Sequence, residues 1–294
     1  SYDKQFEITM DALFIPSIIA LGGLGLMFGA GLAYASKKFA VYVDPKVEQI
    51  LESLPGANCG ACGKPGCSAY AEAVVKGETP PNLCAPGGAD VTSAISSILG
   101  VQATAEEPKV AITRCQGGHE EAVEKFVYDG IQDCSAAELV GGGSKACGYG
   151  CLGLGSCVKA CPFDAMYMSD NGLPVVIEDK CTACGICVST CPRGIMELIP
   201  RSQKVFLACI SQDKAKAVKS VCKVGCFACK ICTTPKVTPE GAIQMEGNLP
   251  EIKDLNSEDL YTAFDRCPSN SYVIRGERPQ QEKPEENKEE TVEK

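Results

Sequence analysis

The sequence predicts an α+β protein with one membrane-spanning N-terminal helix, a small cysteine module, and a larger region of two related cysteine-rich units. Three observations predict this class. An uncharged apolar segment lies near the N-terminus, the 20 cysteines gather at short regular spacings, and two strand-like stretches recur, each followed by helix-like sequence. The 294 residues leave room for two or three small domains and a linker.

The apolar segment Ala12–Ser36 has 25 residues and no charged side chain. At about 1.5 Å per residue, a helix of that length crosses the roughly 30 Å hydrocarbon layer. Lys37 and Lys38 follow directly and place the C-terminal side in the cytoplasm. We assign residues 1–38 to a single-pass anchor in the cell inner (plasma) membrane. The alternative is a buried helix of a globular domain.

Residues 39–100 are predicted to form a compact module. Four cysteines follow the pattern Cys-x2-Cys-x4-Cys-x16-Cys in a glycine-rich setting, between stretches predicted to be helical at 44–54 and 70–76. This spacing favours one self-contained [4Fe–4S] cluster, with a zinc site as the alternative. The ligands are predicted to be Cys59, Cys62, Cys67 and Cys84. Residues 101–108 are small and acidic, end in proline, and are predicted to be a linker.

Residues 109–278 contain the strongest motif, Cys-x2-Cys-x2-Cys-x3-Cys-Pro at 181–192. This is the bacterial iron–sulfur run, and an earlier Cys-x3-Cys-Pro at 157–162 ends in the same way. In two-cluster ferredoxins the fourth cysteine of each run binds the other cluster. A ferredoxin-like fold is therefore expected here. The first ligand set is predicted to be Cys161, Cys181, Cys184 and Cys187.

The earlier run departs from the standard pattern, because Leu154 stands where the middle cysteine belongs. Cys147 lies just upstream, in a glycine-rich stretch that lets the backbone reach around a cluster. We therefore expect Cys147 to replace the missing ligand. The second set is predicted to be Cys147, Cys151, Cys157 and Cys191.

A degenerate second copy follows. The stretch 204–209 resembles 109–115, and each looks like a buried strand that ends in cysteine. A three-cysteine loop comes later, but Lys236 occupies the place of its fourth cysteine, and a Cys-Pro pair appears only at 267–268. One cluster is expected in this copy. Its ligands are predicted to be Cys226, Cys229, Cys232 and Cys267.

Four cysteines remain, two from each copy: Cys115, Cys134, Cys209 and Cys222. One hypothesis is that they converge on a fifth cluster. The alternative is buried free thiols, which are common core residues.

The sequence also argues against disulfide bonds and against two other kinds of iron cofactor. The cysteines lie at ligand spacing and no cleavable signal is expected, so a reducing compartment is predicted rather than a disulfide scaffold. The single His119 excludes a Rieske centre, which needs two histidines, and is expected to be solvated or packed. No Cys-x2-Cys-His motif for c-type haem occurs. Residues 279–294 lack aromatic side chains and are predicted to be disordered.

The charge distribution suggests a partner. The formal net charge is −9, yet residues 201–236 hold eight Lys and Arg against a single Asp213. Such a basic patch would steer an acidic electron donor, such as a soluble ferredoxin, although a solvated helix face is the alternative. Nucleic-acid binding is not expected, because the chain is acidic overall and has no recognised motif.

The order of these features resembles the B subunit of the Rnf complex. The resemblance covers roughly residues 12–275, and its signature stretches are 58–63 (NCGACG), 84–88 (CAPGG) and 151–157 (CLGLGSC). It is closest to the longer variants of anaerobes, from which this chain departs at Lys236 and in a shortened C-terminal part. The resemblance implies that the chain takes electrons from reduced ferredoxin. It would pass them to membrane subunits and a flavin-containing NAD site, in a complex that pumps Na+ or H+.

No residue pattern in the chain predicts chemistry on covalent bonds, so one-electron transfer through [4Fe–4S] clusters is the expected reaction. Two alternatives remain open from the sequence. The same electron relay could serve another complex, for example one that supplies nitrogenase or a redox regulator. From a different class, the chain could be a membrane-tethered scaffold whose cysteines hold zinc.

Overall fold

The computed structural model describes residues 2–39, 44–104, 107–254, 259–276 and 278. The chain divides into two compact parts, residues 1–48 and 49–294. The predicted tail at 279–294 and part of the predicted linker lie outside the described residues. Helices and strands are mixed, as expected of an α+β protein.

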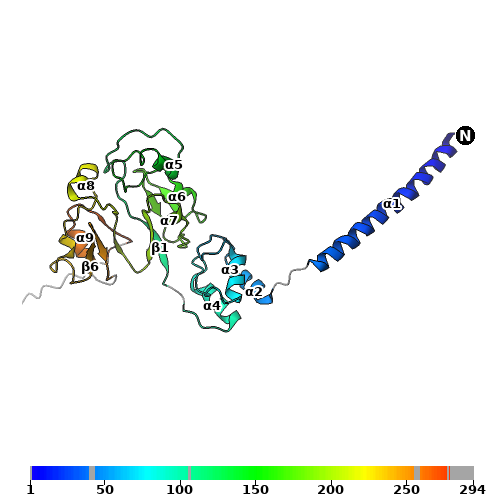
Figure 1. The fold of residues 1–294 in the computed structure, drawn as a ribbon, viewed down its shortest axis with the longest axis horizontal. Coiled ribbons are helices and arrows are strands. Elements are labelled where there is room, and N and C mark those ends of the chain that lie inside the picture. Colours follow the sequence, from blue (N-terminus) through cyan, green and yellow to red (C-terminus); the bar gives the residue numbers. More distant parts are fainter. Residues whose placement is uncertain (1, 40–43, 105–106, 255–258, 277, 279–294) are drawn as a thin grey trace, which may run out of the picture. The chain divides into compact units, whose positions relative to one another are not determined.

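The N-terminal segment is one unbroken helix, α1 (Tyr2–Lys38), drawn in blue in Figure 1. Its stretch Pro16–Lys38 has a mean hydropathy of 1.8 and is long and apolar enough to cross a membrane. Large apolar side chains on it, such as Leu21 and Phe28, are exposed. An exposed apolar surface of this length is typical of a membrane-spanning helix, and the two lysines in the last turn suit the negative end of the helix dipole.

The cysteine module contains three short helices, which are α2 (Pro45–Ser53), α3 (Cys67–Val75) and α4 (Gly88–Leu99). Each buries an apolar side chain completely or nearly so: Ile50 in α2, Tyr70 in α3 and Ile95 in α4. The buried Tyr70 hydroxyl donates to the Pro80 carbonyl at 3.0 Å and accepts from the amide of Leu83. These bonds fix the loop that carries Cys84 against α3.

The rest of the chain forms two units with the same strand order (Figure 1). We call residues 109–200 the first unit; it contains β1 (Lys109–Thr113), α5 (Cys134–Leu139), α6 (Ser156–Lys159), β2 (Met166–Met168), β3 (Pro174–Val176), α7 (Ile186–Thr190) and β4 (Met196–Pro200). We call residues 204–276 the second unit; it contains β5 (Val205–Leu207), α8 (Ala215–Val221), η1 (Ile231–Thr233), β6 (Ile243–Glu246), β7 (Leu249–Ile252), α9 (Leu260–Asp265) and β8 (Tyr272–Ile274).

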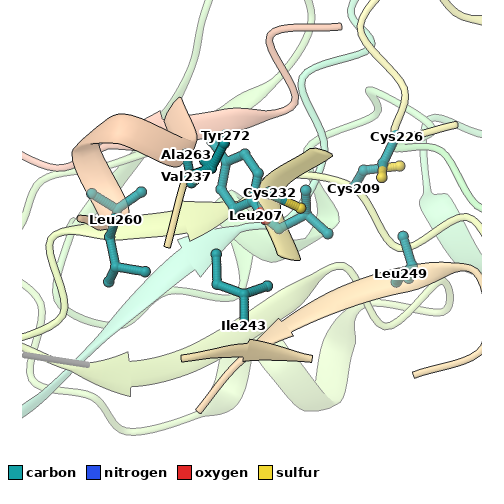
Figure 2. Packing of buried hydrophobic residues seen from close by; sticks show 11 residues of the cluster. Leu207, Cys209, Cys226, Cys232, Val237, Ile243, Leu249, Leu260, Ala263 and Tyr272 are labelled. Carbon is teal, nitrogen blue, oxygen red and sulfur yellow. The ribbon is translucent and has the colours of Figure 1, made fainter. Parts of the chain in front are cut away.

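In both units the outer strands pair with each other and the inner strands form a hairpin. β1 pairs antiparallel with β4, and β2 with β3; β5 pairs antiparallel with β8, and β6 with β7. The sheets therefore have only two strands each and offer little apolar surface. Cysteine side chains belong to the cores of both units, and Figure 2 shows Cys209, Cys226 and Cys232 among the apolar residues of the second.

Two arginines connect the units. Arg114, just after β1, donates to the Glu197 carboxylate at 2.9 Å and to the Leu207 carbonyl of β5. Arg275, just after β8, is buried and forms a two-bond pair with Glu178 at 2.8 and 2.7 Å. Hydrogen bonds and charge from Arg275 lower the pKa of Glu178, against the opposing effect of partial burial. The two units are thus joined by charge-assisted bonds as well as by packing.

Candidate iron–sulfur sites

In the N-terminal module, the four cysteines Cys59, Cys62, Cys67 and Cys84 line one cavity. Local bonds set their positions. The Asn58 side chain accepts from the amide of Cys67 at 2.9 Å and holds the start of α3 against the loop. Gly87 must lack a side chain, because a Cβ atom there would lie 2.4 Å from Val91 and 3.1 Å from the Cys84 sulfur. The sequence predicted this set from spacing alone.

In the first unit, a second cavity is lined by Cys161, Cys181, Cys184 and Cys187. The amide of Ala111 in β1 donates to the Cys181 sulfur at 3.5 Å. The Thr182 hydroxyl, on the wall of this cavity, is buried and faces the Cys184 sulfur rather than an oxygen or nitrogen acceptor. A buried hydroxyl needs an acceptor, and sulfur is the acceptor that this cavity offers.

The second unit has an equivalent cavity, lined by Cys226, Cys229, Cys232 and Cys267. Here, too, a buried hydroxyl on the wall faces a cysteine sulfur: that of Tyr272 in β8 faces Cys232. Burial, followed by the nearby charge of Cys232, raises the pKa of this phenol, so it stays protonated and able to donate. Cys229 differs from the rest, because it is the only exposed cysteine among the 20, all of which the structure describes.

A fourth cavity brings together Cys115, Cys147, Cys209 and Cys222. Three of these belong to the set left over by the sequence analysis, but Cys147 was expected in the second ligand set of the first unit. Cys134, the fourth member of the leftover set, does not line this cavity.

Cys134 lies instead beside Cys157. Burial raises the pKa of Cys157 to about 11, and the charges of Cys134 and then Cys191 add to the effect. Burial also raises the pKa of Cys151 to about 12, with contributions from Cys115 and Cys157. The structure thus gathers Cys134, Cys151, Cys157 and Cys191 in one neighbourhood.

The cysteine groups do not have the spacing of single-ion sites. Four thiolates around one zinc lie about 3.8 Å apart, given Zn–S bonds of about 2.3 Å. Among the residues that the structure describes, no three His, Cys, Asp or Glu side chains gather closely enough to hold one metal ion. A cubane separates its thiolates further, because each binds a different iron atom. Together with the two buried hydroxyls that face cysteine sulfur, this geometry fits [4Fe–4S] clusters.

Two further residues are notable. Lys145 is only 1% exposed, and its ammonium group donates to the Gly117 carbonyl beside the fourth cavity. Sequence reasoning missed it, because a lysine in a glycine-rich loop gives no sign of burial. His119 is more than half exposed and lies 3.4 Å from the Glu124 carboxylate, so it is a surface residue, as expected.

Comparisons with known proteins agree with these sites. Residues 54–86 match a family model described as "Putative Fe-S cluster", and residues 148–198 match a "4Fe-4S dicluster domain". The second segment holds seven cysteines, one fewer than two clusters require, so one ligand must come from outside it.

Three relatives match most of the chain. The B subunit of the Na+-translocating ferredoxin:NAD+ oxidoreductase complex of Acetobacterium woodii is 43% identical over 89% of this chain and 78% of its own length. The chain belongs to this B-subunit family. The B subunit of the ion-translocating oxidoreductase complex of Methanosarcina acetivorans is 41% identical over 90% of this chain and 100% of its own length. The B subunit of the proton-translocating ferredoxin:NAD+ oxidoreductase complex of Clostridium ljungdahlii is 44% identical over 86% and 90%.

Proposed function

We propose that this chain is the electron-transfer B subunit of a membrane ion-translocating ferredoxin:NAD+ oxidoreductase complex. The observation that carries the proposal is that four separate cavities are each lined by four cysteines, in a member of this family. A bound [4Fe–4S] cluster supplies reversible one-electron chemistry. Several such sites in one chain suit a relay, and no residue arrangement described here suggests chemistry on covalent bonds.

Three ligand sets follow from the cavities and from the spacing in the sequence. The sets are Cys59, Cys62, Cys67 and Cys84 in the module, Cys161, Cys181, Cys184 and Cys187 in the first unit, and Cys226, Cys229, Cys232 and Cys267 in the second. The thiols are buried or half-buried, apart from Cys229. Burial disfavours free thiolates, so binding to iron would stabilise the deprotonated form of these sulfur atoms in the interior.

The protein's own groups would set each reduction potential. Backbone amides donate to sulfur at Cys181 and Cys115, at 3.5 and 3.4 Å. The hydroxyls of Thr182 and Tyr272 face the sulfur atoms of Cys184 and Cys232 and would do the same. Such bonds stabilise the more negative, reduced form of a cluster and raise its potential.

Electrons would enter at the second unit. Its loop exposes Cys229, and the exposed Lys214, Lys216 and Lys219 lie at or in α8 of the same unit. The Lys219 ammonium lies 4.0 Å above the ring of Phe227, which is in the three-cysteine loop. A soluble acidic ferredoxin is the donor that this charge would attract.

The membrane anchor sets the location. The helix Pro16–Lys38 would anchor the chain in the cell membrane. The two lysines at its C-terminal end favour the cytoplasmic side, so the iron–sulfur domains that follow would lie at the cytoplasmic face. There they would pass electrons to the membrane subunits and flavin-containing subunits of the same complex. The names of the relatives include both Na+ and proton translocation, so the coupling ion is a question for experiment.

The proposal is tested on the intact complex, purified from membranes without oxygen. We expect a brown preparation that bleaches with dithionite, contains iron and acid-labile sulfide, and reduces NAD+ with electrons from reduced ferredoxin. Repeating the assay with and without Na+ identifies the ion. A colourless preparation with zinc and negligible sulfide would overturn the proposal in favour of a zinc scaffold. A brown complex inactive with ferredoxin and NAD+ would point to a relay of another complex.

The docking surface has its own test. Reversing Lys214, Lys216 and Lys219 to Glu should raise the KM for ferredoxin at least about tenfold at low salt and abolish most of the salt dependence. A control with the same net charge reverses three exposed lysines elsewhere: Lys46, Lys76 and Lys125. Equal effects in both triple variants would contradict docking at α8.

A further inference from the structure

The cavity lined by Cys115, Cys147, Cys209 and Cys222 lies between the first and second units and receives two cysteines from each side. We propose that it is a fifth [4Fe–4S] site that joins the two units electronically, and that Cys134 takes the place of Cys147 beside Cys151, Cys157 and Cys191. The inference rests on the proposed function only in that the chain carries iron–sulfur clusters.

The cavity has the same composition as the three sites predicted from cysteine spacing. Each of the four cavities is lined by four cysteines that come from more than one loop or element. The Cys115 and Cys222 sulfur atoms both lie within 4 Å of the place that a Cβ atom would take at Gly117, and Cys147 and Cys209 line the same cavity. The sulfur atoms therefore face a common space. Isolated core thiols would not be expected to converge in fours.

The backbone around the cavity approaches the cysteine sulfur atoms closely at two glycines. A Cβ atom at Gly117 would lie 3.2 Å from the Cys222 sulfur and 3.9 Å from that of Cys115. A Cβ atom at Gly225 would lie 2.5 Å from Val218 and 3.7 Å from the Cys222 sulfur. Both glycines line the cavity, so larger side chains would displace the ligands.

Cys134 is held on the other side of the first unit. Its amide donates to the Ser156 hydroxyl at 2.8 Å, and that hydroxyl donates to the Asp133 carboxylate at 2.8 Å. Ser156 precedes Cys157 in the chain, so this network places Cys134 next to Cys157. With Cys134 in place of Cys147, the seven cysteines of residues 148–198 gain the eighth ligand that two clusters need.

The fifth site connects to both neighbouring sites through single hydrogen bonds. On the first-unit side, the amide of Cys151 donates to the Cys115 sulfur at 3.4 Å. On the second-unit side, the amide of Cys226 donates to the Cys209 sulfur. Figure 2 shows the sulfur atoms of Cys209 and Cys226 side by side. A ligand of each neighbouring site thus contacts a ligand of the fifth, which is the arrangement of a bridge.

The buried ammonium group of Lys145, beside this cavity, favours a negatively charged group inside it. The Lys145 ammonium donates to the carbonyl of Gly117, which lines the cavity. No carboxylate pairs with Lys145 among the described residues. Burying an ammonium without a counter-charge is costly. A four-thiolate cluster, which carries net negative charge in both oxidation states, provides the missing counter-charge.

The test compares single Cys→Ala variants of the full-length protein, purified without oxygen. Wild type should contain about twenty iron atoms per chain rather than about sixteen, since each cluster holds four. Cys115→Ala, Cys147→Ala and Cys209→Ala should each lose about four iron atoms and the same signal from the electron paramagnetic resonance spectrum. Cys134→Ala should instead lose the signal that is lost in Cys157→Ala.

Two outcomes would overturn the inference. Cys147→Ala could lose the same signal as Cys191→Ala, which would return Cys147 to the dicluster set. Alternatively, wild type could hold about sixteen iron atoms, with iron unchanged in Cys115→Ala. In that second case the electron relay itself survives, whereas a protein without iron would end both proposals. For variants that fail to fold, Gly117→Ala should perturb the same signal by crowding Cys222, and Gly148→Ala, whose Cβ meets no atom within 4 Å, should not.

Discussion

The first and second units share a strand order but fill their interiors differently. The buried cluster of the second unit has eleven members, including Val237, Ile243 and Leu260. The corresponding cluster of the first unit has five, two of them cysteines, and three more first-unit residues belong to a small cluster shared with the second unit. Val237 directly follows Lys236, the position at which the fourth cysteine is missing. Under the proposed ligand sets, one fold would be stabilised either by two sites of sulfur and iron, or by one such site and a larger apolar core.

The largest expected effect tests this contrast directly. Removing the clusters with a chelator and oxidant should unfold the first unit, because its apolar core is too small to support it. The second unit should keep residual structure around its larger core. Hydrogen exchange should show nearly complete loss of protection in β1 and β4 and partial protection in β5 and β8. Greater loss in the second unit would contradict the comparison.

The next effect concerns the joint between the units. Arg275→Met should destabilise the protein by about 2 kcal/mol, because it breaks a largely buried pair whose Glu178 partner remains partly solvated. Arg278→Met removes the exposed pair with Asp265 and should cost less than about 0.5 kcal/mol. Thermal unfolding of the cluster-loaded protein, followed by visible absorbance, measures both. Equal costs would show that Arg275 does not hold the units together.

Much of this organisation could be predicted from the sequence, because cysteine spacing within one loop is a local property. The three sets with regular spacing line common cavities, and the short strands at 109–113 and 205–207 lie where the repeat predicts them. The sequence could not predict that Cys147 lines the cavity between the units and that Cys134 lies beside Cys157. This arrangement depends on the Asp133–Ser156 network and on how the two units meet, which are long-range contacts.

The burial of Lys145 could not be predicted from the sequence either, and it gives a third prediction. Lys145→Met removes a positive charge beside the joint of the units and should lower the reduction potential of a neighbouring cluster by roughly 60–100 mV. Lys125→Met is the matched control, because Lys125 also donates to a glycine carbonyl but is exposed. Redox titration measures both. A shift of the same size in the control would remove Lys145 from the electrostatics of the site.

The smallest expected effect returns to the feature that the two units share. Thr182→Val in the first unit and Tyr272→Phe in the second each remove a buried hydroxyl that faces a cysteine sulfur, Cys184 in the first unit and Cys232 in the second. If a cluster sulfur accepts from each hydroxyl, its loss should lower the potential of that unit's own cluster by about 20–60 mV, the equivalent of one hydrogen bond of about 1 kcal/mol. The other unit's potential should stay unchanged, which makes each variant the control for the other. If both potentials remain at the wild-type value, the hydroxyls do not reach the clusters, and the likeness of the two cavities is limited to their cysteines.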